Sequence, residues 1–457
     1  MTNSNENIIR FSKLDDPFYV KPIELASAQR LDIAIKYDFA LNYVSNFKSS
    51  SSIRNYLQHI EIINGYFENN APYKIGKKDF LSSFTNLLDQ TFEQVEPLPV
   101  GIGNNILDGA HRVASAILQD VSELEVQTFD AQHQIYDYDF FASRGFPSFA
   151  LDELVRSFTS IQPKTRLLII WPTAQHDKDR VLDQVNKELG SIIIVKTCNL
   201  TEVDAAKLVH LAYITEDWHG SRYDCYQGIR NKTKNVGFNA NSTPFTICVF
   251  ECKVEALKLV SFKENIRESF GFGKNSLHIT DTHNETIDLV SLFCNQKAWH
   301  DYFRSPTLEA SEAVNTFKSM TENLNLNVRK DIIITGGLLS ILGYKGVSDF
   351  DYSTFSGNEI SELQSFDFEG PTASLPGDFD IDTNSYELFG VRFLDLQYTL
   401  KIKEKDNRLS DRVDIATVIN HYPENRNIIN KINLFRYKLI YSSRLIVFKI
   451  LRILNLK

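Results

Sequence analysis

The stretch IITGGLLSILGYKGVSDFDY at residues 333–352 decides how the last third of the chain folds. An apolar strand ends at the glycine pair Gly336 and Gly337. After eleven further residues comes the acidic pair Asp349 and Asp351, on a second strand-like segment. Alternation along a strand places both carboxylates on one face, where they can hold a divalent metal against the phosphates of a nucleotide. The glycines let the backbone approach those phosphates without an intervening side chain.

This spacing, with its preceding strand and intervening helix, resembles the DNA polymerase beta-like nucleotidyltransferase superfamily. The resemblance implies catalysis by Asp349 and Asp351 with Mg²⁺ or Mn²⁺ bound to both, and a nucleotide substrate such as CTP or ATP. The residues assigned to phosphate binding here are Gly336, Gly337 and Ser348. The alternative is a helical turn followed by an unrelated acidic strand.

Two later features extend the resemblance. A later strand of this superfamily usually supplies a third carboxylate, and the candidates are Asp380, Asp382 and Asp395. The segment VRFLDLQYTLKIKEKDNRLSDRVDIATVI at residues 391–419 resembles the closing part of small bacterial members, where a helix with Lys precedes an Asp-rich segment. The corresponding residues are Lys401, Lys403, Asp411 and Asp414. A solvated charged helix is the alternative for these four.

A second motif, ILDGAHRVASAI at residues 106–117, lies between an extended segment and a predicted helix. Backbone N–H groups at such a turn and helix start can bind an anion. Arg112 adds a planar fork for phosphate, and His111 can donate a further hydrogen bond. The candidate phosphate-binding residues are Asp108, Gly109, His111 and Arg112.

This motif resembles the ParB/sulfiredoxin-like fold, in which Asp-Gly-x-His-Arg at a strand-to-helix turn binds nucleotide phosphate. Members of that fold include free-serine kinases and nucleotide-hydrolysing switches. Residues 19–32 resemble its opening strand and make Glu24 a candidate base. The alternative is a helix cap with a structural arginine. No basic helix-turn-helix region is evident, so DNA binding of the chromosome-partitioning kind is not expected.

The middle of the chain holds two polar clusters. The first, at residues 276–286, follows a strand and comprises His278, Asp281, His283 and Glu285. These residue types can bind metal or perform acid–base chemistry, so His278, Asp281 and His283 are catalytic candidates. Upstream, Lys263 and Arg267 share one helical face and can bind an anionic substrate. The second cluster comprises Glu216, His219, Arg222 and Arg230. Ordinary polar loop residues are the alternative for both clusters.

Composition limits the class of protein. The chain has 457 residues, a net charge of −9 and a pI near 5.7, which disfavours a general nucleic-acid binder. No run approaches the roughly 20 apolar residues of a membrane span. Five irregularly spaced cysteines and a polar N-terminus predict a cytoplasmic protein with reduced thiols. No Walker A, GxGxxG or GxSxG motif occurs, which disfavours P-loop kinases, dinucleotide dehydrogenases and typical serine hydrolases.

The tail at residues 425–457 has eight basic residues, no acidic one and many apolar residues. As a helix it would have a broad apolar face bordered by Arg and Lys, which suits the headgroup region of an anionic membrane. A helix docked on the protein's own acidic surface is the alternative. We therefore expect a cytoplasmic protein that can associate with the inner face of the plasma membrane through this segment.

These features predict a multidomain protein of α/β and α+β class. The expected regions are a ParB/sulfiredoxin-like domain at 1–150, a central α/β domain with a parallel βαβ unit at 151–304, a nucleotidyltransferase-like domain with a mixed sheet at 305–424, and the basic helix at 425–457.

The expected function is metal-dependent nucleotidyl or phosphate transfer to a sugar, polyol phosphate or growing glycan. A weak likeness of the central region to proteins of bacterial surface-polysaccharide loci suggests that acceptor. The ParB/sulfiredoxin-like module would bind a second nucleotide or act as a kinase. Two alternatives stay open: a non-catalytic nucleotide-sensing regulator, and a nucleotidylating toxin or defence factor.

Overall fold

The protein is represented by a computed structural model. It describes residues 12–45, 49–66, 75–132, 134–220, 224–271, 273–303, 310–321, 324, 326–345, 350–355, 363, 368–369 and 379–421. The chain divides into two compact units: unit 1 contains Met1–Leu200 and Asn235–Asn295, and unit 2 contains Thr201–Lys234 and Gln296–Lys457. The predicted tail helix at 425–457 lies outside the described residues. Within the described part, no helix is both long and apolar enough to cross a membrane.

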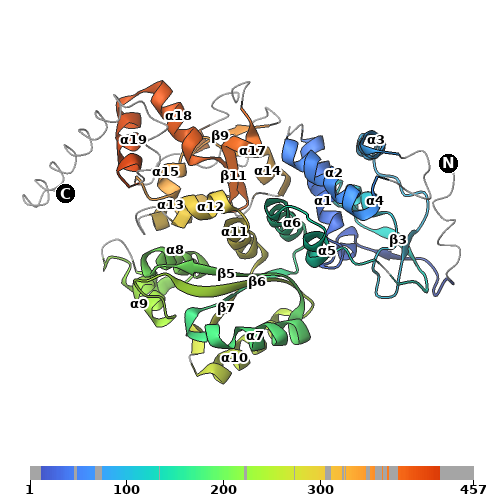
Figure 1. The fold of residues 1–457 in the computed structure, drawn as a ribbon, viewed down its shortest axis with the longest axis horizontal. Helices are drawn as coiled ribbons and strands as arrows, with labels where there is room; N and C mark the ends of the chain where they lie inside the picture. Colours follow the sequence, from blue (N-terminus) through green and yellow to red (C-terminus); the bar gives the residue numbers. More distant parts are fainter. Residues whose placement is uncertain are drawn as a thin grey trace, which may run out of the picture. The chain divides into compact units, whose positions relative to one another are not determined.

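The predicted mixed α/β class is confirmed, because helices accompany three separate sheets in the described chain (Figure 1). The first sheet of unit 1 has the order β1-β3-β2. Its strands are β1 (Phe18–Val20), β2 (Leu98–Val100) and β3 (Leu124–Thr128). β1 is antiparallel to β3, whereas β2 is parallel to it. The chain passes from β2 through helix α4 to β3, so the DGAHR motif lies at the turn of a parallel βαβ unit.

Six helices follow the strands of this part of unit 1. They are α1 (Asp32–Val44), α2 (Ser50–Asn64), α3 (Lys77–Leu88), α4 (Ala110–Leu118), α5 (Tyr138–Ser143) and α6 (Ser148–Ile161). α1 is buried along most of its length and packs against α2, α4 and α6. The Ser49 hydroxyl accepts a hydrogen bond from the Ser52 N–H and begins α2, which ends at Gly65 with φ +61°.

The second sheet of unit 1 has the order β5-β6-β4-β7, and every pairing in it is antiparallel. Its strands are β4 (Thr165–Ile170), β5 (Gly190–Leu200), β6 (Thr243–Cys252) and β7 (Leu277–Ile279). The predicted parallel pairing of β4 with β5 is therefore wrong. The two strands run in the same direction, but β6 lies between them and forms hydrogen bonds with both. The helices accompanying this sheet are α7 (Lys178–Gln184), α10 (Ala256–Phe270) and α11 (His283–Phe293).

Unit 2 contains the predicted mixed sheet, with the order β10-β9-β8-β12-β11. Its strands are β8 (Ile332–Ile334), β9 (Phe350–Thr354), β10 (Phe368–Glu369), β11 (Ser385–Leu388) and β12 (Val391–Leu394). β8 is antiparallel to β9 and parallel to β12, and β10 is parallel to β9. The apolar strand and the acidic strand predicted from the sequence are thus direct neighbours.

The helices of unit 2 come from two parts of the sequence. They are α8 (Glu202–Ala212), α9 (Gln227–Asn235, which ends in unit 1), α12 (Gln296–Phe303), α13 (Ala310–Thr321), α14 (Leu326–Asp331), α15 (Leu338–Ile341), α17 (Ile381–Asn384), α18 (Leu396–Asp406) and α19 (Leu409–His421). Phe317 of α13 contacts Phe350 and Phe393, with ring centroids 5.2 and 5.1 Å apart. This aromatic group fixes α13 on the sheet and holds the start of β9 in place.

Candidate functional site

The glycine pair lies between β8 and α15. The N–H groups of Thr335 and Gly336 donate to the carbonyl oxygen of Asp351 at 2.8 and 3.2 Å. Gly337 has φ +84° and forms the N-cap of α15, a conformation that a residue with a side chain adopts only at a cost. The backbone therefore joins the end of β8 directly to the acidic strand β9.

Both glycines are required by the space around them. A Cβ added to Gly336 would lie 2.1 Å from Asp351 Oδ2, and one added to Gly337 would lie 2.3 Å from Phe350 Cδ1. The half-buried carboxylate of Asp351 thus lies against the bare Cα of Gly336. Asp349 and Ser348, the other residues predicted on this side of the site, lie outside the described residues.

The three predicted candidates for a third carboxylate lie at helix N-termini. Asp380 N-caps α17, where its carboxylate accepts from the Asp382 N–H at 3.1 Å and the Thr383 hydroxyl at 2.6 Å. Asp382 itself lies in the first turn of α17. Asp395 N-caps α18, accepts from the Tyr398 N–H at 2.6 Å and pairs with Lys297 at 3.3 Å. Capping accounts for the positions of Asp380 and Asp395 without a metal.

Glu369 is a residue that the sequence reasoning missed. It lies on β10 at the register position paired with Asp351 of β9. The signal was present in the sequence, because FDFE at residues 366–369 alternates apolar and acidic residues in the manner of a short strand. β10 places an acidic residue of a later strand directly beside the acidic strand.

Three of the four predicted residues of α18 and α19, Lys403, Asp411 and Asp414, form one ion-pair network. Lys403 Nζ lies 3.0 Å from a carboxylate oxygen of Asp411 and 3.0 Å from one of Asp414. Arg408 Nε binds the other oxygen of Asp411 at 2.8 Å. Burial acts to raise the pKa of Asp411, but hydrogen bonds from Arg408 and Lys403 outweigh it and hold that pKa below its ordinary value. Lys401 is exposed at the surface of α18.

The DGAHR motif forms the turn between β2 and α4 in unit 1. Gly109 has φ +95°, and a Cβ there would lie 2.8 Å from Leu98 Cδ2. The Asp108 carboxylate accepts from the Gly109 N–H at 2.7 Å. His111 Nε2 lies 3.0 Å from the hydroxyl of buried Tyr56, and half-buried Arg112 lies 3.7 Å from Glu96. The candidate base Glu24 is exposed on a 3₁₀ turn, Pro22–Leu25, that packs against α4.

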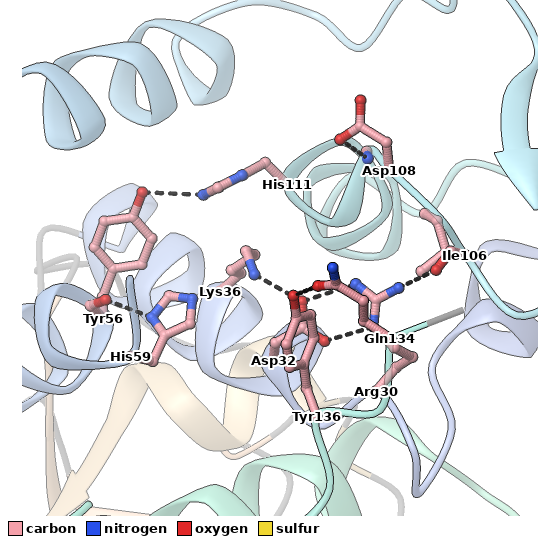
Figure 2. A network of polar contacts seen from close by, with 11 residues as sticks. Arg30, Asp32, Lys36, Tyr56, His59, Ile106, Asp108, His111, Gln134 and Tyr136 are labelled. Atoms are coloured by element: carbon pink, nitrogen blue, oxygen red, sulfur yellow. Dashed lines mark hydrogen bonds and ion pairs between the residues drawn. The ribbon is translucent and has the colours of Figure 1, made fainter. Parts of the chain in front are cut away.

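A buried ionic network supports this turn. Asp32, at the start of α1, binds Arg30 Nε at 2.8 Å and Lys36 Nζ at 2.8 Å, and all three residues are buried. Figure 2 shows the Arg30 guanidinium also reaching the carbonyl of Ile106, two residues before Asp108. Burial acts to raise the pKa of Asp32, but the two cations outweigh it and hold that pKa far below its ordinary value. The network ties α1 to the chain that enters the motif.

The first polar cluster of the middle region lies mostly at the start of α11. The Thr282 hydroxyl accepts from the Glu285 N–H at 3.1 Å, while Glu285 accepts from the Asp281 N–H at 2.7 Å and contacts His278 Nε2 at 2.7 Å. His283 Nε2 instead contacts the carbonyl of Thr159, at 2.6 Å. Thus His278 contacts the carboxylate of Glu285, whereas His283 contacts the backbone of α6.

The predicted anion-binding residues of α10 take carboxylate partners from the protein. Buried Lys263 forms an ion pair with Asp281. Arg267 pairs with Glu264 on its own helix at 2.7 Å. The Lys263–Asp281 pair joins α10 to the loop after β7 and gives the buried lysine a carboxylate partner.

The second polar cluster belongs to unit 2. His219 is buried and its ring lies 5.2 Å from that of His210 on α8. The guanidinium of Arg230 donates to the Cys225 carbonyl at 2.8 Å. Glu216 is exposed, and Arg222 lies outside the described residues. Burial, with His219 and Lys318 nearby, lowers the pKa of His210 to about 3, so this side chain is neutral in the fold.

The glycine turn of unit 2 offers a carboxylate oxygen, the kind of ligand that Mg²⁺ prefers. Within the described ranges, no three His, Cys, Asp or Glu side chains gather closely enough to form a metal site by themselves. Asp351 supplies one carboxylate, set in a cradle that a Cβ at Gly336 would fill. Comparisons with family models, with curated proteins and with solved structures gave no match for this chain.

Proposed function

We propose that this protein is a metal-dependent transferase that moves a nucleotidyl or phosphoryl group, and that the chemistry takes place at the glycine turn of unit 2. One observation carries the proposal: the carboxylate of Asp351 lies against the bare Cα of Gly336, at the joined ends of two antiparallel strands. The backbone of the glycine turn and the carboxylate of Asp351 therefore lie together at the ends of two neighbouring inner strands, with no side chain on either glycine.

Asp349 and Asp351 would hold Mg²⁺ or Mn²⁺, with Glu369 as the third carboxylate from the neighbouring strand. The metal, when bound, neutralises negative charge on the phosphates of a nucleotide such as CTP or ATP. Gly336 and Gly337, predicted to bind phosphate, leave room for the Asp351 carboxylate and the Phe350 ring, so the phosphates would bind beside that carboxylate. An acceptor hydroxyl oxygen then bonds to phosphorus, the bond from that phosphorus to the leaving phosphate oxygen breaks, and the hydroxyl proton passes to solvent.

The acceptor that we propose is a sugar, a polyol phosphate or a growing glycan of a bacterial surface polysaccharide. Support for it comes from the likeness seen in the sequence and from the basic, apolar segment 425–457, which suits attachment to an anionic membrane surface. We also propose that the DGAHR turn of unit 1 binds a second nucleotide or phosphate. The support for this proposal is the left-handed backbone at Gly109, which caps α4, together with His111 and Arg112 in the first turn of that helix.

The main test is consumption of labelled CTP or ATP in the presence of Mg²⁺ by the full chain. The double variant Asp349→Ala with Asp351→Ala should lose metal-dependent turnover, and Glu369→Gln should lower it by at least about tenfold if that carboxylate supports the metal. Asp380→Asn is the matched control, since asparagine also caps helices. Turnover that persists in the double variant would remove the proposal.

The module of unit 1 has its own test. Arg112→Ala should weaken nucleotide binding to this unit, because a guanidinium contact with phosphate is lost. The measurement is calorimetric titration of the full chain carrying Asp349→Ala and Asp351→Ala, so that binding at the other site does not contribute. Unchanged affinity in Arg112→Ala would reduce the DGAHR motif to a structural turn.

A further inference from the structure

An exposed arginine near the glycine turn has no place in the function described so far. Arg408 lies in the turn between α18 and α19, directly after Asn407, which has φ +55° and closes α18. α18 and α19 pack side by side (Figure 1). The Arg408 side chain is 69% exposed, whereas Lys403 of α18 is largely buried between the carboxylates of Asp411 and Asp414.

Arg408 is held in place on one side. Its Nε lies 2.8 Å from Asp411 Oδ2, and its backbone N–H donates to the same oxygen at 3.2 Å. Asp411 is buried and its other oxygen is bound by Lys403. An arginine clamped in this way keeps its guanidinium plane fixed and needs little ordering on binding a ligand.

The remaining edge of the guanidinium is open. Nη2 lies 3.5 Å from exposed Asp406, at the outer limit of a hydrogen bond, and Nη1 has no partner within the part of the chain that the structure describes. The fork is therefore able to donate to an oxyanion from solvent.

Two observations connect Arg408 with the glycine turn. Lys345, which closely follows α15, lies 3.9 Å from Asp414 of α19, and Asp414 shares Lys403 with Asp411, the partner of Arg408. The segment after α15 and the turn that holds Arg408 therefore belong to one ion-pair network. The hydrogen bond and charge of Asp411 raise the pKa of Arg408 most, and the charges of Asp406 and Asp351 raise it to a smaller extent. Arg408 thus lies within electrostatic reach of the carboxylate that would hold the metal.

We propose that Arg408 binds the phosphates that are not transferred, so that its guanidinium and the carboxylate of Asp351 act on the same nucleotide. The inference rests on the proposed function of the same site. When the bond to the transferred phosphorus breaks, negative charge builds up on the departing phosphate oxygens. A fixed guanidinium stabilises that charge without taking part in the metal's coordination.

The proposal is tested by calorimetric titration of the full chain with MgATP and MgCTP, and with the matching monophosphates. Arg408→Gln should weaken triphosphate binding by about 10- to 100-fold, as expected for the loss of a charged hydrogen-bonding group. Monophosphate affinity should not change. The triphosphate affinity of Arg408→Lys should lie between those of the wild type and Arg408→Gln, because lysine keeps the positive charge but lacks the planar guanidinium. Arg412→Gln is the matched control, since Arg412 lies in the first turn of α19, next to Arg408, and binds Asn407 at 2.9 Å.

The outcomes separate this inference from the proposed function. If Arg408→Gln binds triphosphates like the wild type while the Asp349→Ala, Asp351→Ala variant does not, the role of Arg408 is wrong and the proposed site stands. If Arg408→Gln weakens the binding of mono- and triphosphates equally, Arg408 does not bind the phosphates that distinguish the two ligands, and the proposal is wrong. If the wild type binds no magnesium nucleotide, the proposed function fails and this inference fails with it. Thermal unfolding of Arg408→Lys, which can keep the contact with Asp411, shows whether the fold is intact.

Discussion

Replacing Gly336 with alanine tests whether the glycine turn and Asp351 form one site. The new Cβ would lie 2.1 Å from Asp351 Oδ2 and 2.8 Å from its Cγ. Nonbonded heavy atoms settle at about 3.5–4.0 Å, so the carboxylate must move by more than about 1 Å. The phenyl ring of Phe350 holds the strand from the other side, because it packs against Gly337. The displacement therefore falls mainly on the Asp351 side chain.

The expected magnitude follows from that displacement. Overpacking of this kind costs about 1–3 kcal/mol of unfolding free energy. Moving a group that would hold the metal by about 1 Å lowers turnover by about 100-fold. The stability effect depends only on the structure, whereas the loss of turnover also depends on the proposed function.

A double-mutant cycle in urea isolates the contact. Asp351→Ala removes Oδ2 and Cγ and leaves the Cβ at 3.0 Å, so the cost of Gly336→Ala should fall below about 1 kcal/mol in that background. Gly271→Ala is the control, because Gly271 has φ +70° and no atom within 4 Å of an added Cβ. Its cost should be about 1 kcal/mol in either background. An equal cost of Gly336→Ala with and without Asp351 would refute the described contact.

Three further predictions concern buried charges. Asp32→Asn should destabilise unit 1 by about 3–5 kcal/mol in urea, since it leaves Arg30 and Lys36 buried without their counter-charge; a loss below about 1 kcal/mol would contradict this. Burial lowers the pKa of Lys207 from 10.5 to about 8. Below pH 8 the buried ammonium group destabilises the folded state, so the free energy of unfolding should rise by about 3 kcal/mol as the pH increases towards 10.5. Lys207→Met should abolish that rise, which denaturation at pH 7.5 and 10 can measure. Burial lowers the pKa of His210 from 6.5 to about 3, so the folded state loses stability as pH falls from 6.5 towards 3; His210→Phe should lose about 3 kcal/mol less between pH 7 and 4, and identical acid curves would show that His210 does not titrate in this way.

The parts of the site that the sequence predicted are those set by short-range spacing. The strand before Gly336 and the acidic strand containing Asp351 are neighbours because the intervening segment is only long enough for a short helix and a turn. The same holds for Gly109, where a left-handed turn between β2 and α4 needs a glycine. At both turns, the residue type that the sequence pattern favours is also the one that the backbone and its surroundings require.

The parts that could not be predicted depend on pairing between distant segments. β6 inserts between β4 and β5 after a detour of more than forty residues, and nothing in the apolar runs specifies which neighbour each strand takes. A buried strand looks alike whether its partner is parallel or antiparallel. Glu369 was missed for the same reason, since its relation to Asp351 comes from the parallel pairing of β9 with β10.

The cluster from His278 to Glu285 includes contacts of the kind that cap a helix. The pattern Thr-x-x-Glu at residues 282–285 is a capping-box sequence, and Thr282 does cap α11. Glu285 reaches back to the backbone N–H of Asp281 rather than to that of Thr282, which also brings it within 2.7 Å of His278. The need to satisfy N–H groups at the start of a helix thus explains why acidic and hydroxyl residues gather after β7. The same need explains Asp380 and Asp395. For a polar cluster directly before a helix, capping of the helix N-terminus is therefore the first interpretation to test. Asp351 lies within β9, so helix capping does not explain its position.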